Sequence, residues 1–135
     1  MHRLKLALQP EIPMSAKIFG WFMVLAGSAF AIIYMTTPGT AFPGVSIVSY
    51  SEQFRLYSTG VRIIAAVLGL VVALTLNSAA LLALMLVTRV ITEAGDVILG
   101  LVINNGVPDA NTYALTALTL VEVWFVVKLV KVVLR

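Results

Sequence analysis

The sequence predicts an all-α fold, an integral membrane four-helix bundle with both termini on the cytoplasmic side. Charged residues make up 11% of the chain and hydrophobic residues 61%, whereas soluble domains carry about 25% charged residues. Four long apolar segments are separated by three breaks that contain Pro, Gly or Asn, residues typical of turns and loops. Lys and Arg gather toward the two ends of the chain, as they do in cytoplasmic flanks of membrane helices.

Each apolar segment is long enough to cross a bilayer, because about 20 helical residues span its hydrocarbon layer. The chain therefore forms a single transmembrane domain, residues 1–135, and four crossings with their loops use its whole length. The expected spans are residues 16–36, 55–76, 79–103 and 112–133.

The connections between the spans differ in length. A long loop with two Pro-Gly pairs, residues 36–53, follows the first span. Asn77 and Ser78 form the only polar break between the second and third spans, so a two-residue turn is expected there. In "NNGVPDAN", residues 104–111, Gly106 is expected to end the third helix and Asn111 to cap the fourth.

Orientation follows from the distribution of Lys and Arg, which favours the cytoplasmic side. One side of the membrane would hold Lys and Arg from both ends of the chain, and the other side would hold only Arg55. Both termini are therefore expected in the cytoplasm, and a bacterial inner membrane is the expected location. Small residues Gly20, Gly27 and Ala31 recur along the first span and predict close approach of a neighbouring helix.

Composition excludes several kinds of site. The chain has no cysteine and one histidine, His2, so neither a cysteine nor a histidine metal site is expected, and no cofactor is implied. The basic residues form no patch with interleaved aromatics, which argues against a nucleic-acid partner. The expected partners are the lipid bilayer and either other membrane subunits or a lipophilic ligand.

Five ionisable residues nevertheless lie inside the expected spans. Arg89, Glu93 and Asp96 share one helix face in "TRVITEAGDVILG", at about 15, 21 and 25 Å from the cytoplasmic surface. Counted from the outer surface, Arg62 lies at about 10 Å and Glu122 at about 15 Å. Because unpaired charges are costly in lipid, we expect all five to face inward.

These depths predict partners for the two arginines. Arg62 would meet Glu93 or Asp96 in the outer half of the bilayer. Arg89 would meet Glu122 or Glu93 near the midplane. Both predictions assume straight, upright helices of regular rise.

Three interpretations of this charged group remain open. In the leading one, the charges form a ladder that fixes helix register in a non-catalytic accessory or assembly subunit. In the second, Glu93, Asp96 or Glu122 is a catalytic acid or base acting on a lipophilic substrate, with isomerase-like or epoxide-hydrolase-like chemistry. Arg62 or Arg89 would then orient the carboxylates or stabilise developing negative charge. In the third, the carboxylates mark a proton or ion path.

The stretches "FRLYSTGVRIIAAVLGL" and "TRVITEAGDVILGLVINNGVPDA", followed by a last span with one glutamate, resemble small four-helix membrane proteins related to DoxX. These include families of unknown function, and the resemblance covers roughly residues 16–134. It implies the four-helix fold and no particular reaction. The chain departs from the pattern by placing Glu93 beside Asp96 and by having "NNG" where an acidic residue often precedes the glycine. The positions that match the pattern are Arg55, Gly60, Arg62, Arg89, Asp96, Gly106, Pro108 and Glu122.

Overall fold

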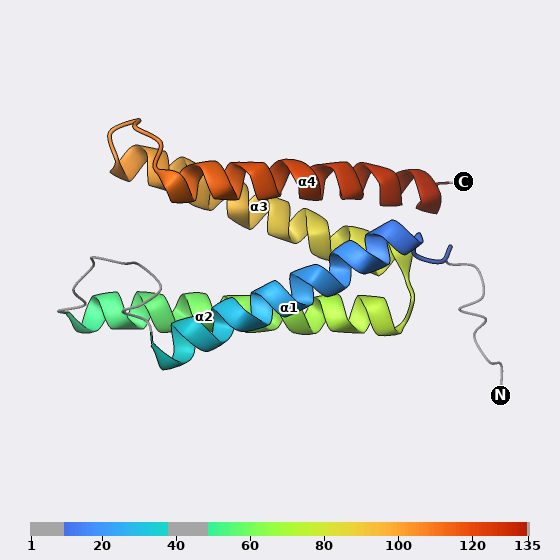
Figure 1. The fold of residues 1–135 in the computed structure, drawn as a ribbon, viewed down its shortest axis with the longest axis horizontal. Coiled ribbons are helices and arrows are strands. Elements are labelled where there is room, and N and C mark those ends of the chain that lie inside the picture. Colours follow the sequence, from blue (N-terminus) through green and yellow to red (C-terminus); the bar gives the residue numbers. More distant parts are fainter. Residues whose placement is uncertain (1–9, 38–48, 135) are drawn as a thin grey trace.

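Four α-helices make up the fold (Figure 1). The computed structural model describes residues 10–37 and 49–134, and within these ranges the all-α prediction is confirmed. Three of the terminal basic residues on which the predicted orientation depends, Arg3, Lys5 and Arg135, fall outside these ranges, as do residues 38–48 of the first loop. The helices are α1 (Met14–Thr36), α2 (Tyr50–Thr75), α3 (Ala79–Ile103) and α4 (Ala110–Val133).

Each helix covers one of the four apolar segments, and the short turns follow from local chemistry. Asn77 adopts a positive φ of 51°, and the Ser78 hydroxyl accepts a hydrogen bond from the Leu81 amide at 3.3 Å, capping α3. Gly106, at a φ of 81°, donates its amide to the Leu101 carbonyl at 2.7 Å and ends α3 as expected.

The cap of α4 differs from the expectation. Asp109 supplies it, because its Oδ1 atom accepts a hydrogen bond from the Thr112 amide at 2.7 Å. The prediction that Asn111 caps α4 is wrong, because the helix begins at Ala110 and an N-cap residue lies immediately before the first helical turn.

The helices form two antiparallel hairpins, α1 with α2 and α3 with α4, and α2 also contacts α3 (Figure 1). We call the end where the described chain begins and finishes the terminal end, and the end with the α1–α2 and α3–α4 connections the loop end. The hairpins approach each other at the terminal end and diverge toward the loop end (Figure 1).

The hydrophobic core lies toward the terminal end. Its largest fully buried apolar side chains are Leu70, Leu82, Leu86 and Leu129. Here α1 also meets α4, where the rings of Phe19 and Phe125 stack with centroids 4.2 Å apart. Both ends of the described chain lie at the terminal end, as expected for four helices that run alternately up and down (Figure 1).

Small residues allow α1 to approach α2 closely. A Cβ atom added at Gly27 would lie 2.7 Å from Cγ2 of Val67, and one added at Gly20 would lie 2.9 Å from Cδ2 of Leu74. Both distances are shorter than normal carbon–carbon contacts. The small-residue stripe predicted on the first span thus faces a neighbouring helix.

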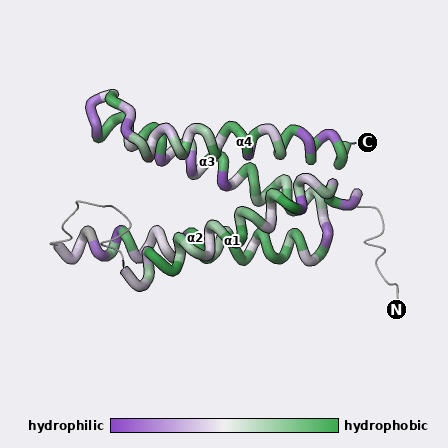
Figure 2. Tube along the Cα trace, viewed as in Figure 1, coloured by the Kyte–Doolittle hydropathy of each residue, from purple (hydrophilic) through white to green (hydrophobic). Residues whose placement is uncertain are grey.

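Two helical segments are long and apolar enough to cross a membrane, Met14–Thr36 and Gln53–Thr75. Only 28% and 22% of their most apolar windows are buried, whereas a core helix of a soluble protein would be mostly buried. Apolar residues also run along α3 and α4 (Figure 2), but α3 includes Arg89, Glu93 and Asp96. The structure thus gives a weak indication of membrane association.

Replacing Gly27 by Leu should destabilise the α1–α2 hairpin by about 1–3 kcal/mol, because the new side chain would overlap Val67. Ala29→Leu is the matched control, since Ala29 is exposed on the same helix. Thermal unfolding in detergent measures both variants. Equal stability of the two would contradict the close packing described here.

Candidate functional site

Arg89 binds two carboxylates in the interior of the α3–α4 hairpin. Its Nε atom donates to Oε1 of Glu122 on α4 at 2.8 Å, and its Nη2 atom donates to Oε1 of Glu93 on α3. Glu122 is 0% exposed and Glu93 is 8% exposed. We call these three residues the Arg89 triad. The prediction that Arg89 meets Glu122 or Glu93 is confirmed, and it contacts both.

The chain positions this triad by two simple geometric relations. Arg89 and Glu93 are four residues apart and lie on one helix face. Arg89 lies 14 positions before the last residue of α3, Ile103, and Glu122 lies 12 positions after the first residue of α4, Ala110, so the two are nearly equally distant from the turn. In an antiparallel hairpin, residues equally distant from the turn lie at the same level, because both helices rise 1.5 Å per residue. The tight turn therefore brings Glu122 opposite Arg89.

Two polar atoms of the Arg89 triad lack a hydrogen-bond partner. One oxygen of each carboxyl group, Oε2 of Glu93 and Oε2 of Glu122, is buried without a hydrogen-bond partner. The three side chains carry one permanent positive charge against two acidic groups. Buried polar atoms are nearly always hydrogen-bonded in proteins, so these two oxygens require an explanation.

Arg62 does not make the ion pair that was expected of it. Its guanidinium is exposed and donates to the hydroxyl of Thr59 on its own helix at 3.3 Å. The structure shows no salt bridge from Arg62 to Glu93 or Asp96. The depths along the helices were consistent with such a pair, but the hairpins carrying α2 and α3 diverge toward the loop end (Figure 1).

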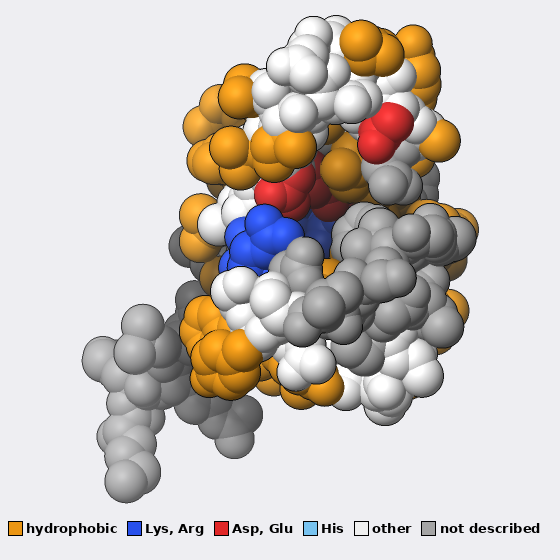
Figure 3. All heavy atoms as spheres, turned by 90° about the vertical axis from the view of Figure 1, so that its left-hand side faces the viewer, with side chains coloured by type: hydrophobic (Ala, Val, Ile, Leu, Met, Phe, Trp, Pro, Cys, Tyr) orange, Lys and Arg blue, Asp and Glu red, His pale blue; other side chains and the backbone are white. Residues whose placement is uncertain are grey.

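Asp96 is also exposed, one turn beyond Glu93 on α3. Tyr34, half-buried near the end of α1, lies close enough to Asp96 and Arg62 for both charges to act on its phenol. Basic and acidic side chains accordingly gather between the two halves of the molecule at the loop end (Figure 3). We call Arg62, Asp96 and Tyr34 the loop-end group.

Sequence reasoning did not single out Tyr34. The available signal was its position late in the first apolar segment, at the outer level at which Arg62 and Asp96 were placed. The structure separates the five ionisable residues expected inside the spans into the buried Arg89 triad and an exposed pair, Arg62 and Asp96.

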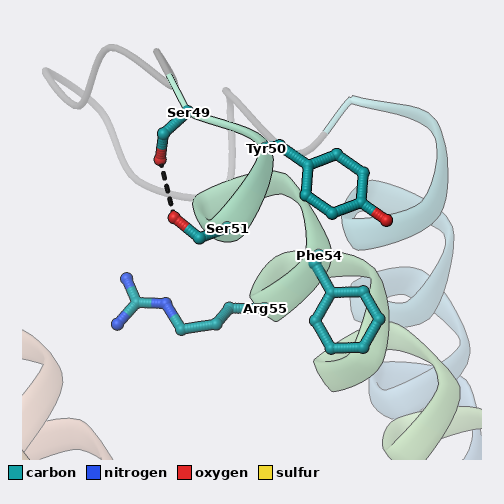
Figure 4. Close-up of a pocket in the computed structure, with 5 residues that line it drawn as sticks. All are labelled: Ser49, Tyr50, Ser51, Phe54 and Arg55. Carbon is teal, nitrogen blue, oxygen red and sulfur yellow. Dashed lines mark hydrogen bonds between the residues drawn. The ribbon is translucent and has the colours of Figure 1, made fainter.

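A shallow pocket of about 650 Å³ lies at the start of α2 (Figure 4). The Ser49 and Ser51 hydroxyls are 3.0 Å apart there, and the Arg55 side chain points away from Tyr50 and Phe54. The lining contains none of the three candidate carboxylates. Over the described residues, no group of three or more His, Cys, Asp and Glu side chains is arranged to hold a metal ion.

Comparison with known proteins adds no relative. No family model matches the chain, and no significant match occurs among curated proteins or solved structures.

Proposed function

We propose that this chain is a four-span membrane protein that acts as a non-catalytic accessory or assembly subunit. Both termini would lie in the cytoplasm, with the loop end outside a bacterial inner membrane. The apolar character of α1 and α2 supports membrane insertion, and the shared position of both ends of the described chain supports an even number of crossings. A distant relationship to DoxX-related proteins is part of this proposal.

The burial of the Arg89 triad carries the non-catalytic assignment. A catalytic acid or base must reach the proton that it transfers, directly or through one water. Glu122 is fully buried and Glu93 nearly so, and each carboxyl group is bonded to Arg89. The burial of two of the three candidate catalytic carboxylates therefore supports a role in contacts between helices.

The triad is well suited to fixing helix register. Sliding α4 along α3 by one residue would separate Glu122 from Arg89 and leave buried charges uncompensated, which is strongly unfavourable. Apolar contacts alone tolerate such shifts better, because they are not directional. A membrane subunit would use this constraint to present a fixed surface to a partner.

The loop-end group supplies that surface in the proposal. Arg62 and Asp96 are exposed, have opposite charge and make no ion pair within the described chain. In a membrane, charged side chains at such depths bind a partner of opposite charge or line a hydrated space. A partner subunit contacting the loop end would satisfy them.

A second candidate function rests on the same three residues. Asp96 is the one candidate carboxylate that is exposed, and a phenol and a guanidinium lie near it. This combination is suitable for binding a lipophilic ligand or for acid–base chemistry on it, of the isomerase or epoxide-hydrolase type. The third interpretation, a proton or ion path, predicts pH-dependent flux in liposomes that contain the purified protein.

Membrane topology is tested by cysteine labelling, since the natural chain has no cysteine. Cysteine at Val107, near the loop end, should react with a membrane-impermeant maleimide added to intact spheroplasts. Cysteine at Leu134, near the terminal end, should react only after the membrane is permeabilised. Both positions are exposed. Equal labelling of both in intact spheroplasts would contradict the proposed topology.

The subunit function is tested by placing the photo-crosslinker benzoyl-phenylalanine at Tyr34 in native membranes. A discrete protein adduct is expected at Tyr34, and Asp96→Asn should weaken it because the partner loses a charged contact. Leu25 is the control position, since it is 71% exposed on the same helix and should give lipid adducts alone. Lipid adducts alone at both positions would contradict a partner at the loop end, and a small-molecule adduct at Tyr34 would favour the ligand-binding alternative.

A further inference from the structure

The two unpartnered oxygens of the Arg89 triad have a common feature. Each belongs to a carboxyl group whose other oxygen already accepts a hydrogen bond from Arg89. The two carboxyl groups also lie within hydrogen-bonding reach of each other. If both were ionised, neither would have a hydrogen to donate, and the two oxygens would remain buried and unsatisfied.

The charge balance points in the same direction. Two carboxylates against one guanidinium leave one excess negative charge in a buried site, which is costly unless it is compensated. No further side-chain cation compensates it within the described chain. Asp96 on α3 is acidic, Arg62 on α2 bonds Thr59, and Tyr34 on α1 is a phenol near those two groups. Lys128, farther along α4, donates to the Ser15 hydroxyl.

A metal ion is a poorer fit than a proton. Hard cations such as Mg²⁺ and Ca²⁺ take about six to eight oxygen ligands, and the triad offers two free oxygens. A single proton needs only one donor oxygen and one acceptor oxygen.

We propose that Glu93 and Glu122 form a proton-binding site in which one proton is shared between their Oε2 atoms. One carboxyl group is then a carboxylic acid and the other a carboxylate. The shared proton satisfies both free oxygens with one hydrogen bond, and it makes the triad electrically neutral. This inference rests on contacts within the α3–α4 hairpin and goes beyond the subunit function.

Infrared spectroscopy of the purified full chain tests the proton directly. Exposed carboxyl groups are ionised at neutral pH, so a protonated carboxyl band at that pH identifies a buried acid. The band should be present in the natural protein and in Asp96→Asn, and should shift when the glutamates carry carbon-13 carboxyls. Absence of a glutamate-sensitive band would overturn the proposal, and this measurement needs no variant to fold.

Glutamine substitutions test whether Glu93 and Glu122 share one proton. A glutamine amide donates a hydrogen bond where the carboxylic acid would, so Glu93→Gln and Glu122→Gln should each remove the infrared band. Each should also keep the melting midpoint within about 2 °C of the natural protein. Glu93→Gln/Glu122→Gln leaves Arg89 without a carboxylate and should lower the midpoint by more than about 5 °C.

The alternative occupant is a sodium ion. Exchange of sodium for choline at constant pH and ionic strength should leave the melting midpoint unchanged if the site holds a proton. A midpoint that falls on removal of sodium, and falls less in Glu93→Gln, would show a cation in the site and overturn the proposal.

Discussion

The hydrogen-bonded ion pair between Arg89 and Glu122 constrains the structure more than any other single contact. It joins α3 to α4 between two side chains that are almost removed from solvent, at 2.8 Å from Nε to Oε1. Hydrophobic contacts would permit several registers of two apolar helices, whereas a buried charge permits only the register in which its partner is opposite. The turn through Gly106 and the cap at Asp109 set the same register from the end of the hairpin.

The two ends of the molecule have different physical characters. Leucines and the stacked Phe19–Phe125 pair fill the space between the hairpins at the terminal end. At the loop end the hairpins diverge (Figure 1), and the side chains of Arg62 and Asp96 are exposed. The triad lies between these regions along α3, where buried apolar residues up to Leu86 give way to ionisable ones. A packed end and a charged, less packed end are consistent with a scaffold that presents a binding surface.

The sequence predicted the fold well because its signals were local. Four apolar segments, the Asn77–Ser78 turn and the glycine at 106 each specify helix positions through composition or backbone preference. The partners of Arg89 were also predictable, because spacing along a helix and distance from a turn determine which residues share a level.

The hydrogen bond of Arg62 to Thr59 and the position of Tyr34 near Arg62 and Asp96 could not be predicted in this way. Depth along a helix says nothing about the separation of two hairpins, which depends on tertiary packing such as that of Phe19 on Phe125. The predicted N-cap of α4 is wrong because the helix begins two residues earlier than expected, at Ala110. Membrane insertion of all four helices was an inference from composition, and the structure supports it weakly through α1 and α2.

The central claim, that Arg89 and Glu122 are directly coupled in the folded state, is tested most directly by a double-mutant cycle. The free energies of unfolding of Arg89→Gln, Glu122→Gln and Arg89→Gln/Glu122→Gln are measured in one detergent. We expect a coupling energy of about 1–3 kcal/mol, with Glu122→Gln restoring stability to Arg89→Gln because it removes an uncompensated acid. Additive effects, within about 0.5 kcal/mol, would show that the two residues do not interact and would contradict the claim.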